Sequence, residues 1–424
     1  MRVLLISANT ENINMRVLPV GLGAVAAATQ REGHEVRMLD LMRAENPTAM
    51  VREAAEDFDP RVIGISVRNI DDQTMANPRF LVGQVKDVIS WCRDASSATI
   101  VLGGSGYSIF PESVLAYLDA DMGIQGEGER AFPILLSRME QDAELSGVPG
   151  LYVAGFGRVG ERRFEKDLDG LPLPNPVLWS TGATRDSEIW VPFQTRRGCP
   201  MDCSYCSTRS IEGGTIRKRN PEAVGDGVTR YVEAGFTRFH FVDNVFNLPP
   251  SYAGALCHVL IQRGLGISWQ AILYPGRLKP RLVKEMRKAG CTEVSLGFES
   301  GSERILGSMN KHFSREDVRR ASEMLAEEGI RQMGFLLLGG PGETKGSVEE
   351  SLAFVDSLRL DAVKVTVGIR IYPYTALAQT ALREGIISPG DDLLFPRFYL
   401  TRGIEDWLHE TVRVWAAGQP HRVM

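Results

Sequence analysis

Short apolar runs alternate with stretches of helical periodicity over the first 145 residues of the chain. The apolar runs predict buried strands at residues 3–6, 35–39, 62–67, 99–102 and 122–124. The periodic stretches predict helices at residues 21–32, 47–58, 80–92 and 111–118. Strict alternation of strand and helix builds an open parallel sheet with helices on both faces. We therefore predict a doubly wound α/β domain over residues 1–145.

The pattern changes after residue 145. Residues 146–189 are rich in Gly and Pro, most densely at Asp169–Pro176, and predict an extended linker. Six strand–helix repeats follow, with strands expected at 190–195, 238–242, 268–273, 293–298, 332–338 and 362–370. Their helices are expected at 221–234, 250–263, 280–289, 314–328, 348–358 and 376–384. Because a TIM barrel has eight such repeats, we predict a partial (βα)6 barrel over residues 190–385.

Residues 386–424 form a short C-terminal segment, with a helix expected at 404–416. Two domains and a short helical tail suit a chain of 424 residues. A hydrophobic content of 43% and a charged content of 24% are typical of a soluble globular protein, and no apolar stretch is long enough to span a membrane. The net charge of −5 gives no electrostatic footprint for nucleic acid. We expect a cytoplasmic protein that acts on a small molecule.

Three of the six cysteines, Cys199, Cys203 and Cys206, lie within eight residues at C-x3-C-x2-C spacing. Three thiolates in one tight loop can hold three corners of a 4Fe-4S cluster. No fourth cysteine is nearby, so one iron would keep an open coordination position for chemistry. A structural zinc site is the alternative, but it needs a fourth Cys or His, and none occurs before His240. The spacing therefore favours the cluster.

This motif resembles the radical S-adenosylmethionine (SAM) superfamily. In that family the open iron binds the amino and carboxylate groups of SAM. An electron from the reduced cluster then cleaves SAM to methionine and a 5′-deoxyadenosyl radical. Tyr205 is similar in position to the aromatic residue that lies against the adenine, although a packing role is the alternative. The resemblance implies SAM, a 4Fe-4S cluster and a reducing partner such as flavodoxin or ferredoxin.

Polar and glycine residues follow the predicted barrel strands, where functional groups gather in such barrels. The candidates are Asp243, Asn244, Glu299, Ser300, Ser302 and Gly340. Asp243 and Asn244 could accept hydrogen bonds from an ammonium group. Glu299 and Ser300 could hold the amino or ribose hydroxyl groups of SAM, with a buried salt bridge as the alternative for Glu299. The turn that contains Gly340 could let a ring or sugar lie on the backbone.

Small and polar residues also follow the strands of the N-terminal domain, and open α/β sheets bind ligands at this edge. The candidates are Asn9, Thr10, Ser66, Arg68, Asn69, Gly103, Gly104, Ser105, Gly126, Glu127, Gly128 and Glu129. Glycines there let backbone approach a ligand closely. A tight turn is the alternative for any one glycine, but their recurrence favours a ligand.

This region resembles the cobalamin-binding, Rossmann-like domain that is fused to many radical SAM enzymes. The matching segments are Leu18–Gly23, Gly33–Val36, Ile63–Ser66, Val101–Gly104 and Gly126–Glu129. In the barrel, segments Phe241–Asn244, Gly297–Ser302 and Leu338–Thr344 resemble the cobalamin-dependent branch. The resemblance implies cobalamin as a third cofactor.

One departure concerns the lower face of the cobalt. The best-known cobalamin domains carry a histidine that binds cobalt from below, and the loop after the first predicted strand has none. Arg68 or Asn69 could cover this face without binding the metal. A surface pair between Arg68 and Asp71 or Asp72 is the alternative for the arginine.

Three functions remain open at this point. The first is a methyltransferase in which one SAM supplies a methyl group to cobalamin and another supplies the radical that activates a substrate carbon. The second keeps both cofactors but ends in ring closure, ring contraction or desulfurisation. The third is a noncatalytic iron–sulfur redox protein, against which the polar strand ends argue. We favour the first.

Overall fold

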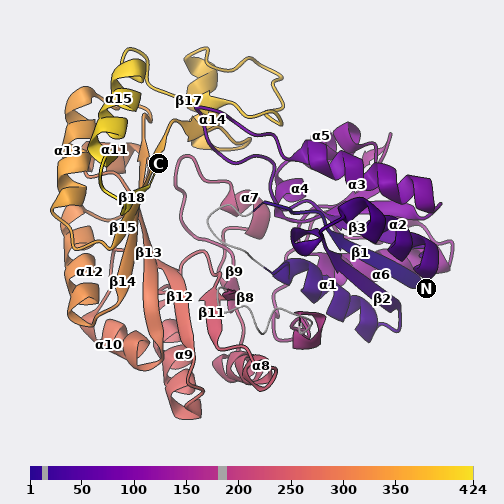
Figure 1. The fold of residues 1–424 in the computed structure, drawn as a ribbon. Coiled ribbons are helices and arrows are strands. Elements are labelled where there is room, and N and C mark those ends of the chain that lie inside the picture. Colours follow the sequence, from indigo (N-terminus) through magenta and orange to yellow (C-terminus); the bar gives the residue numbers. More distant parts are fainter. Residues whose placement is uncertain (12–17, 180–188, 424) are drawn as a thin grey trace. The chain divides into compact units, whose positions relative to one another are not determined.

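The structure is a computed structural model that describes residues 1–11, 18–179 and 189–423 (Figure 1). The chain divides into two compact units. The first comprises residues 1–72, 79–189 and 210–213. The second comprises residues 73–78, 190–209 and 214–424.

The first unit contains a seven-stranded sheet in the order β2-β1-β3-β4-β5-β6-β7. Its strands are β1 (Arg2–Ser7), β2 (Glu35–Asp40), β3 (Val62–Ser66), β4 (Thr99–Gly103), β5 (Met122–Ile124), β6 (Leu151–Val153) and β7 (Gly157–Arg158). The first five pair in parallel, which confirms the predicted doubly wound sheet. β6 and β7 add antiparallel pairs at one edge.

The last two strands lie where the sequence predicted a linker over residues 146–189. The structure differs there because Leu151 and Tyr152 are buried and continue the sheet beside β5. Residues 180–188 of the predicted linker lie outside the described residues.

The helices of the first unit are α1 (Val20–Arg31), α2 (Pro47–Phe58), α3 (Val82–Ala95), α4 (Ser105–Ile109), α5 (Pro111–Leu118) and α6 (Gly128–Glu140). Three short 3-10 turns are η1 (Leu41–Arg43), η2 (Leu145–Gly147) and η3 (Pro176–Trp179). One core cluster joins strand residues such as Val3 and Val101 to Ala26 of α1 and Phe132 of α6. Burial of these apolar side chains supplies the main driving force for the sheet to fold against its helices.

The second unit contains a parallel seven-stranded sheet in the order β18-β15-β14-β13-β12-β11-β8. Its strands are β8 (Val191–Phe193), β11 (Arg238–Phe241), β12 (Ser268–Leu273), β13 (Cys291–Glu299), β14 (Arg331–Leu338), β15 (Ala362–Val367) and β18 (Arg422–Val423). The first six follow one another in chain order, as the partial (βα)6 barrel requires. The C-terminal segment contributes β18, which pairs in parallel with β15.

The helices of this unit are α8 (Pro221–Glu233), α9 (Pro250–Arg263), α10 (Pro280–Lys288), α11 (Glu303–Ser308), α12 (Arg315–Glu327), α13 (Lys345–Asp356), α14 (Ala376–Arg383) and α15 (Glu405–Ala416). Two antiparallel pairs complete it: β9 (Arg196–Arg197) with β10 (Arg217–Lys218), and β16 (Ile369–Arg370) with β17 (Phe398–Tyr399). Proline begins α8, α9 and α10, where its missing N–H costs no helical hydrogen bond. No helix among the described residues is long and apolar enough to cross a membrane.

Candidate active site

The three motif cysteines lie in the loop that leaves β9 at the carboxyl end of the first barrel strand. Cys199 is buried, Cys203 is half-buried and Cys206 is exposed. The backbone N–H of Cys206 donates to the Cys203 carbonyl at 3.1 Å, which closes a tight turn. All six cysteines are among the described residues, and none forms a disulfide. Three such thiols in one turn are a donor set that fits an iron–sulfur cluster.

A single metal ion is a different case. Within the described ranges no group of three or more His, Cys, Asp or Glu side chains is placed to hold one ion. In a cubane cluster each thiolate binds a different iron, so the three sulfur atoms do not have to converge on one point.

A buried ion pair fixes the chain just before the cysteine loop. Asp243, at the end of β11, is fully buried and accepts hydrogen bonds from the backbone N–H groups of Thr195 and Arg196 at 2.8 and 3.0 Å. Its other oxygen lies 2.6 Å from the Thr195 hydroxyl and 3.1 Å from Arg196 Nε. A carboxylate has about four acceptor positions, and these bonds use them. Asp243 therefore anchors the loop, unlike the expected contact with the SAM ammonium.

A second polar cluster lies beside the cysteine loop and joins Tyr205, Glu299 and Lys311. The Tyr205 hydroxyl donates to Glu299 Oε1 at 2.9 Å. Lys311 Nζ donates to the same oxygen at 3.3 Å and to the Gly297 carbonyl at 3.3 Å. Glu299 ends β13 with φ of 66°, a left-handed conformation that costs energy in a non-glycine residue and is found at functional sites.

The protonation of this cluster follows from burial and charge. Burial, reinforced by the Glu299 carboxylate, raises the pKa of Tyr205 well above its usual value, so the phenol keeps its proton. Burial by itself would lower the pKa of Lys311, but Glu299 and Cys203 outweigh it and the pKa is raised. Burial likewise raises the pKa of Cys203, and Lys311 opposes this shift. In the group formed by Tyr205, Glu299 and Lys311, the tyrosine is therefore a neutral phenol and the lysine an ammonium at neutral pH.

The segment Met309–His312 holds Lys311 against the cysteine loop. The backbone N–H of Ser204 donates to the Met309 carbonyl at 3.0 Å. The Asn310 side chain donates to the Asp202 carbonyl at 3.3 Å, and His312 Nε2 lies 2.8 Å from Asp202 Oδ1. Three successive contacts thus fix this segment along the loop that carries the cysteines.

Four other residues of the barrel were predicted to contact SAM, and the structure shows what surrounds each of them. Ser300 is fully buried, shares a hydrogen bond of 3.0 Å with Ser351 and accepts from the Ser302 N–H at 3.1 Å. Ser302 is only 4% exposed. The Ser300 hydroxyl stabilises the turn that follows Glu299 through these bonds, and contacts of Ser300 and Ser302 with SAM stay predictions. The Gly340 carbonyl accepts from Thr401 at 2.5 Å, while Asn244 is half-buried at the end of β11.

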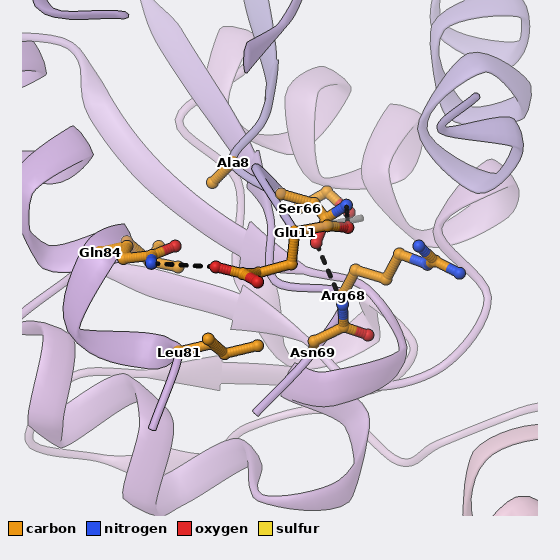
Figure 2. A pocket seen from close by; sticks show the side chains of 9 residues that line it. Ala8, Glu11, Ser66, Arg68, Asn69, Leu81 and Gln84 are labelled. Atoms are coloured by element: carbon orange, nitrogen blue, oxygen red, sulfur yellow. Dashed lines mark hydrogen bonds between the residues drawn. The ribbon is translucent and has the colours of Figure 1, made fainter. Parts of the chain in front are cut away.

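The first unit has a pocket at the carboxyl ends of β1 and β3 (Figure 2). Four predicted residues line it: Asn9, Ser66, Arg68 and Asn69. The Asn69 amide donates to Asn9 Oδ1 at 3.0 Å, and Figure 2 shows the Arg68 guanidinium extending away from this pair. Thr10, beside the pocket, donates to Gln84 Oε1 at 3.0 Å. Amides and a hydroxyl fit the amide-bearing rim of a corrin, which offers both donors and acceptors.

Residues that the sequence did not single out complete this pocket. Glu11 and Gln84 line it, and Gln84 Nε2 lies 3.4 Å from Glu11 Oε1. Glu11 also pairs with Arg79 at 2.9 Å, and Arg79 pairs with Asp72 at 3.2 Å. Asp72 thus pairs with Arg79, whereas the surface pair of Arg68 with Asp71 or Asp72 stays a prediction.

The predicted glycines beyond β4 and β5 meet close packing. At Gly104, where φ is 101°, a Cβ would lie 2.6 Å from the Val67 carbonyl oxygen. At Gly126, where φ is 100°, it would lie 2.9 Å from Arg162 Nε. At Gly103 nothing lies within 4 Å of such an atom. The turn alternative accounts for the first two, whereas Gly103 leaves open space at the strand end.

The polar residues of these turns are bonded within the unit. Ser105 donates to the Arg68 carbonyl at 3.0 Å. The Glu127 carboxylate accepts from the Glu165 N–H at 2.6 Å, and Glu129 is buried in the first turn of α6. A Cβ at Gly128 would lie 2.9 Å from Val25. Contacts of these residues with cobalamin stay predictions.

Two family models match the chain, one in its N-terminal part and the other after it. The B12 binding domain matches residues 6–136, and the Radical SAM superfamily matches residues 194–355. This chain is a cobalamin-dependent radical SAM enzyme. The cofactors of that class are a 4Fe-4S cluster, SAM and cobalamin, as the sequence predicted. The noncatalytic redox protein is set aside.

The relatives of this radical SAM enzyme are similar over most of its length. An uncharacterized methyltransferase of Pyrococcus horikoshii is 27% identical over 400 residues, which cover 91% of this chain and 84% of that protein. The tryptophan 2-C-methyltransferase of Streptomyces laurentii is 22% identical over 89% of this chain and 74% of its own. The structure of the methyltransferase TsrM from Kitasatospora setae, with cobalamin and a [4Fe-4S] cluster bound, superposes with a TM-score of 0.86 at 21% identity. It covers 100% of this chain and 90% of TsrM. This similarity shows the same fold.

Lys311 and Arg196 are two buried residues of the site that were not predicted from the sequence. Lys311 follows α11 in the run Met-Asn-Lys-His, which has the composition of an exposed turn. Arg196 is 2% exposed and donates to the carbonyls of Phe246 and Leu248 at 2.7 and 2.9 Å. Its guanidinium also lies 4.4 Å from the centre of the Tyr252 ring. A buried lysine or arginine has no local sequence signal, because its partners come from distant strands.

Proposed function

We propose that this enzyme transfers a methyl group from SAM, by way of cobalamin, to a carbon atom of a small molecule. The observation that carries the proposal is the pairing of a B12 binding domain with a radical SAM domain in one chain. The names of the relatives support the same chemistry, since the Streptomyces laurentii protein is named for methylation at a carbon. When bound, the cluster supplies the electron that cleaves SAM, and cobalamin carries the methyl group.

The residues of the barrel have separate tasks in this proposal. Cys199, Cys203 and Cys206 bind three irons, and Asp243 keeps their loop in place. Glu299 and Asn244 bind the polar groups of SAM. Tyr205 is held by its bond to Glu299, so its ring can offer a fixed face to the adenine.

The N-terminal pocket binds cobalamin in this proposal. Asn9, Ser66 and Asn69 hydrogen-bond to the rim of the corrin ring. Arg68 or Asn69 would lie near the cobalt without supplying a ligand, and the loop after β1 has no histidine that could supply one. An electron donor such as flavodoxin or ferredoxin reduces the enzyme.

The test uses the whole protein, purified without oxygen and reconstituted with iron, sulfide and hydroxocobalamin. It is incubated with SAM and a reductant, and S-adenosylhomocysteine, 5′-deoxyadenosine and methylated product are measured by mass spectrometry. Tryptophan is the first acceptor to try, because it is the substrate in the name of one relative. We expect S-adenosylhomocysteine in step with methylated product. Formation of 5′-deoxyadenosine with an unmethylated product would instead establish non-methylating chemistry.

A further inference from the structure

Lys311 brings a positive charge into the protein beside the cysteine loop. Its side chain is 7% exposed, and its ammonium lies 5.4 Å from the centre of the Tyr205 ring. Tyr205 lies between Cys203 and Cys206 in the sequence. Burying an ammonium group costs roughly several kcal/mol of desolvation free energy unless nearby negative charges compensate it. The Glu299 carboxylate supplies such a charge at 3.3 Å from Lys311 Nζ. Lys311 is therefore held where negative charge is concentrated.

The backbone fixes this position as firmly as the side chain does. The bonds from Ser204 to Met309 and from Asn310 to Asp202 attach the segment to the loop on both sides of Cys203. Asn310, directly before Lys311, has φ of 56°, a left-handed conformation that asparagine adopts more readily than most residues. A long flexible side chain is thereby delivered to one place.

A cluster bound by three thiolates carries negative charge, and its reduction adds one more electron. A fixed cation nearby stabilises the reduced form by Coulomb attraction, and the low dielectric of a buried site strengthens the effect. Hydrogen bonds and net charge around the sulfurs are known to set the potential of such clusters. Glu299 acts in the opposite direction, since its carboxylate destabilises added negative charge.

We propose that Lys311 is a positioning residue that aims the Glu299 carboxylate and raises the reduction potential of the cluster bound by Cys199, Cys203 and Cys206. This inference rests on the proposed function. The step concerned is the transfer of one electron from an external donor of the flavodoxin or ferredoxin class to the cluster, and no bond to Lys311 forms or breaks.

The test measures the midpoint potential of the reconstituted cluster by redox titration followed by electron paramagnetic resonance. In Lys311→Met we expect a more negative midpoint. The ratio of reduced to oxidised cluster at a fixed potential should fall about tenfold, which is about 59 mV for one electron. Glu299→Gln should shift the midpoint in the positive direction, because it removes a negative charge and keeps the hydrogen-bonding oxygen. The midpoint potential of the double variant should return toward that of the unaltered protein.

Two further variants separate charge from packing. Lys311→Arg keeps the charge and should keep the midpoint. Lys284→Met removes a lysine from the exposed face of α10 and should leave the midpoint unchanged, because solvent and salt screen that charge.

Three outcomes would overturn the inference. The first is an unchanged midpoint in a Lys311→Met protein that retains its iron. The second is a shift of the same sign in Lys311→Met and Glu299→Gln. The third outcome applies if the Lys311→Met protein does not hold iron. It is an unchanged midpoint potential in Glu299→Gln. Failure of the unaltered protein to assemble a cluster would instead remove the proposed function, and this inference with it.

Discussion

The carboxyl ends of the strands in the two units are built from different kinds of side chain. In the barrel, charged groups are buried and bonded to one another, as in the pair Arg196–Asp243 and the cluster of Tyr205, Glu299 and Lys311. In the N-terminal unit, Asn9, Asn69, Gln84 and Ser66 line a pocket together with the charged residues Glu11 and Arg68, and the neutral side chains make contacts such as that of Asn69 with Asn9.

This difference indicates two ways of holding a cofactor. Buried charge pairs fix a loop rigidly, because breaking one leaves an uncompensated charge in the interior. Neutral amides can exchange a bond with each other for a bond with a ligand at little cost. On this argument we expect the barrel loop to keep its arrangement when a cofactor binds, and the amides of the N-terminal pocket to rearrange more readily.

The largest effect should come from the cysteine loop. Cys203→Ala removes one of three cluster ligands, so we expect loss of the cluster and of SAM cleavage. Iron and sulfide content and the visible absorption of the reconstituted protein measure this. Cys92→Ala, in the buried face of α3, should retain full iron content. Normal iron content in Cys203→Ala would contradict the ligand assignment.

The buried pair comes next. Asp243→Ala leaves Arg196 charged and unpaired in the interior, and we expect a loss of about 3–5 kcal/mol in the free energy of unfolding. Chemical denaturation monitored by circular dichroism measures it. The same substitution at the exposed Asp226 of α8, which pairs with Arg263, should cost less than about 1 kcal/mol. Equal costs at the two positions would argue against the anchoring role of Asp243.

The N-terminal pocket should show the reverse pattern, with little change in stability and a change in binding. In Asn69→Ala we expect up to about tenfold weaker retention of cobalamin, as the loss of one hydrogen bond implies. The corrinoid absorption that stays with the protein after gel filtration measures retention. The free energy of unfolding should change by less than about 0.5 kcal/mol. Unchanged retention in both Asn69→Ala and Asn9→Ala would place the cobalamin contacts elsewhere.

The smallest effect is expected at the exposed rim of the barrel site. His312 and Asp202 lie 2.8 Å apart, with side chains 62% and 50% exposed. Because solvent screens such a pair, His312→Ala should cost less than about 1 kcal/mol in the free energy of unfolding and leave iron content unchanged. A loss comparable to that of Asp243→Ala would show that this contact carries more of the loop's stability than its exposure suggests.

Much of the fold could be predicted from the sequence. The helices at Pro47–Phe58, Pro111–Leu118 and Pro250–Arg263 were predicted at their observed bounds, because proline marks their first residue and an apolar face gives their length. The strands β6 and β7 could not be foreseen, since two or three residues are too few to show alternation. The short helix α4 and the helix α6, with a proline inside it, were missed for similar reasons.

The pattern of apolar runs was enough to predict the parallel strands of both units, and the cysteine spacing to predict three cluster ligands, because strand periodicity and ligand spacing are local properties of the chain. Which of the polar residues at the strand ends are bonded within the protein became visible only in the folded chain. Asp243 turned out to hold Arg196, and Ser300 to hold its own turn, while Lys311 was brought beside Glu299. Burial and pairing join residues from distant strands, and they are set by packing that no short segment encodes.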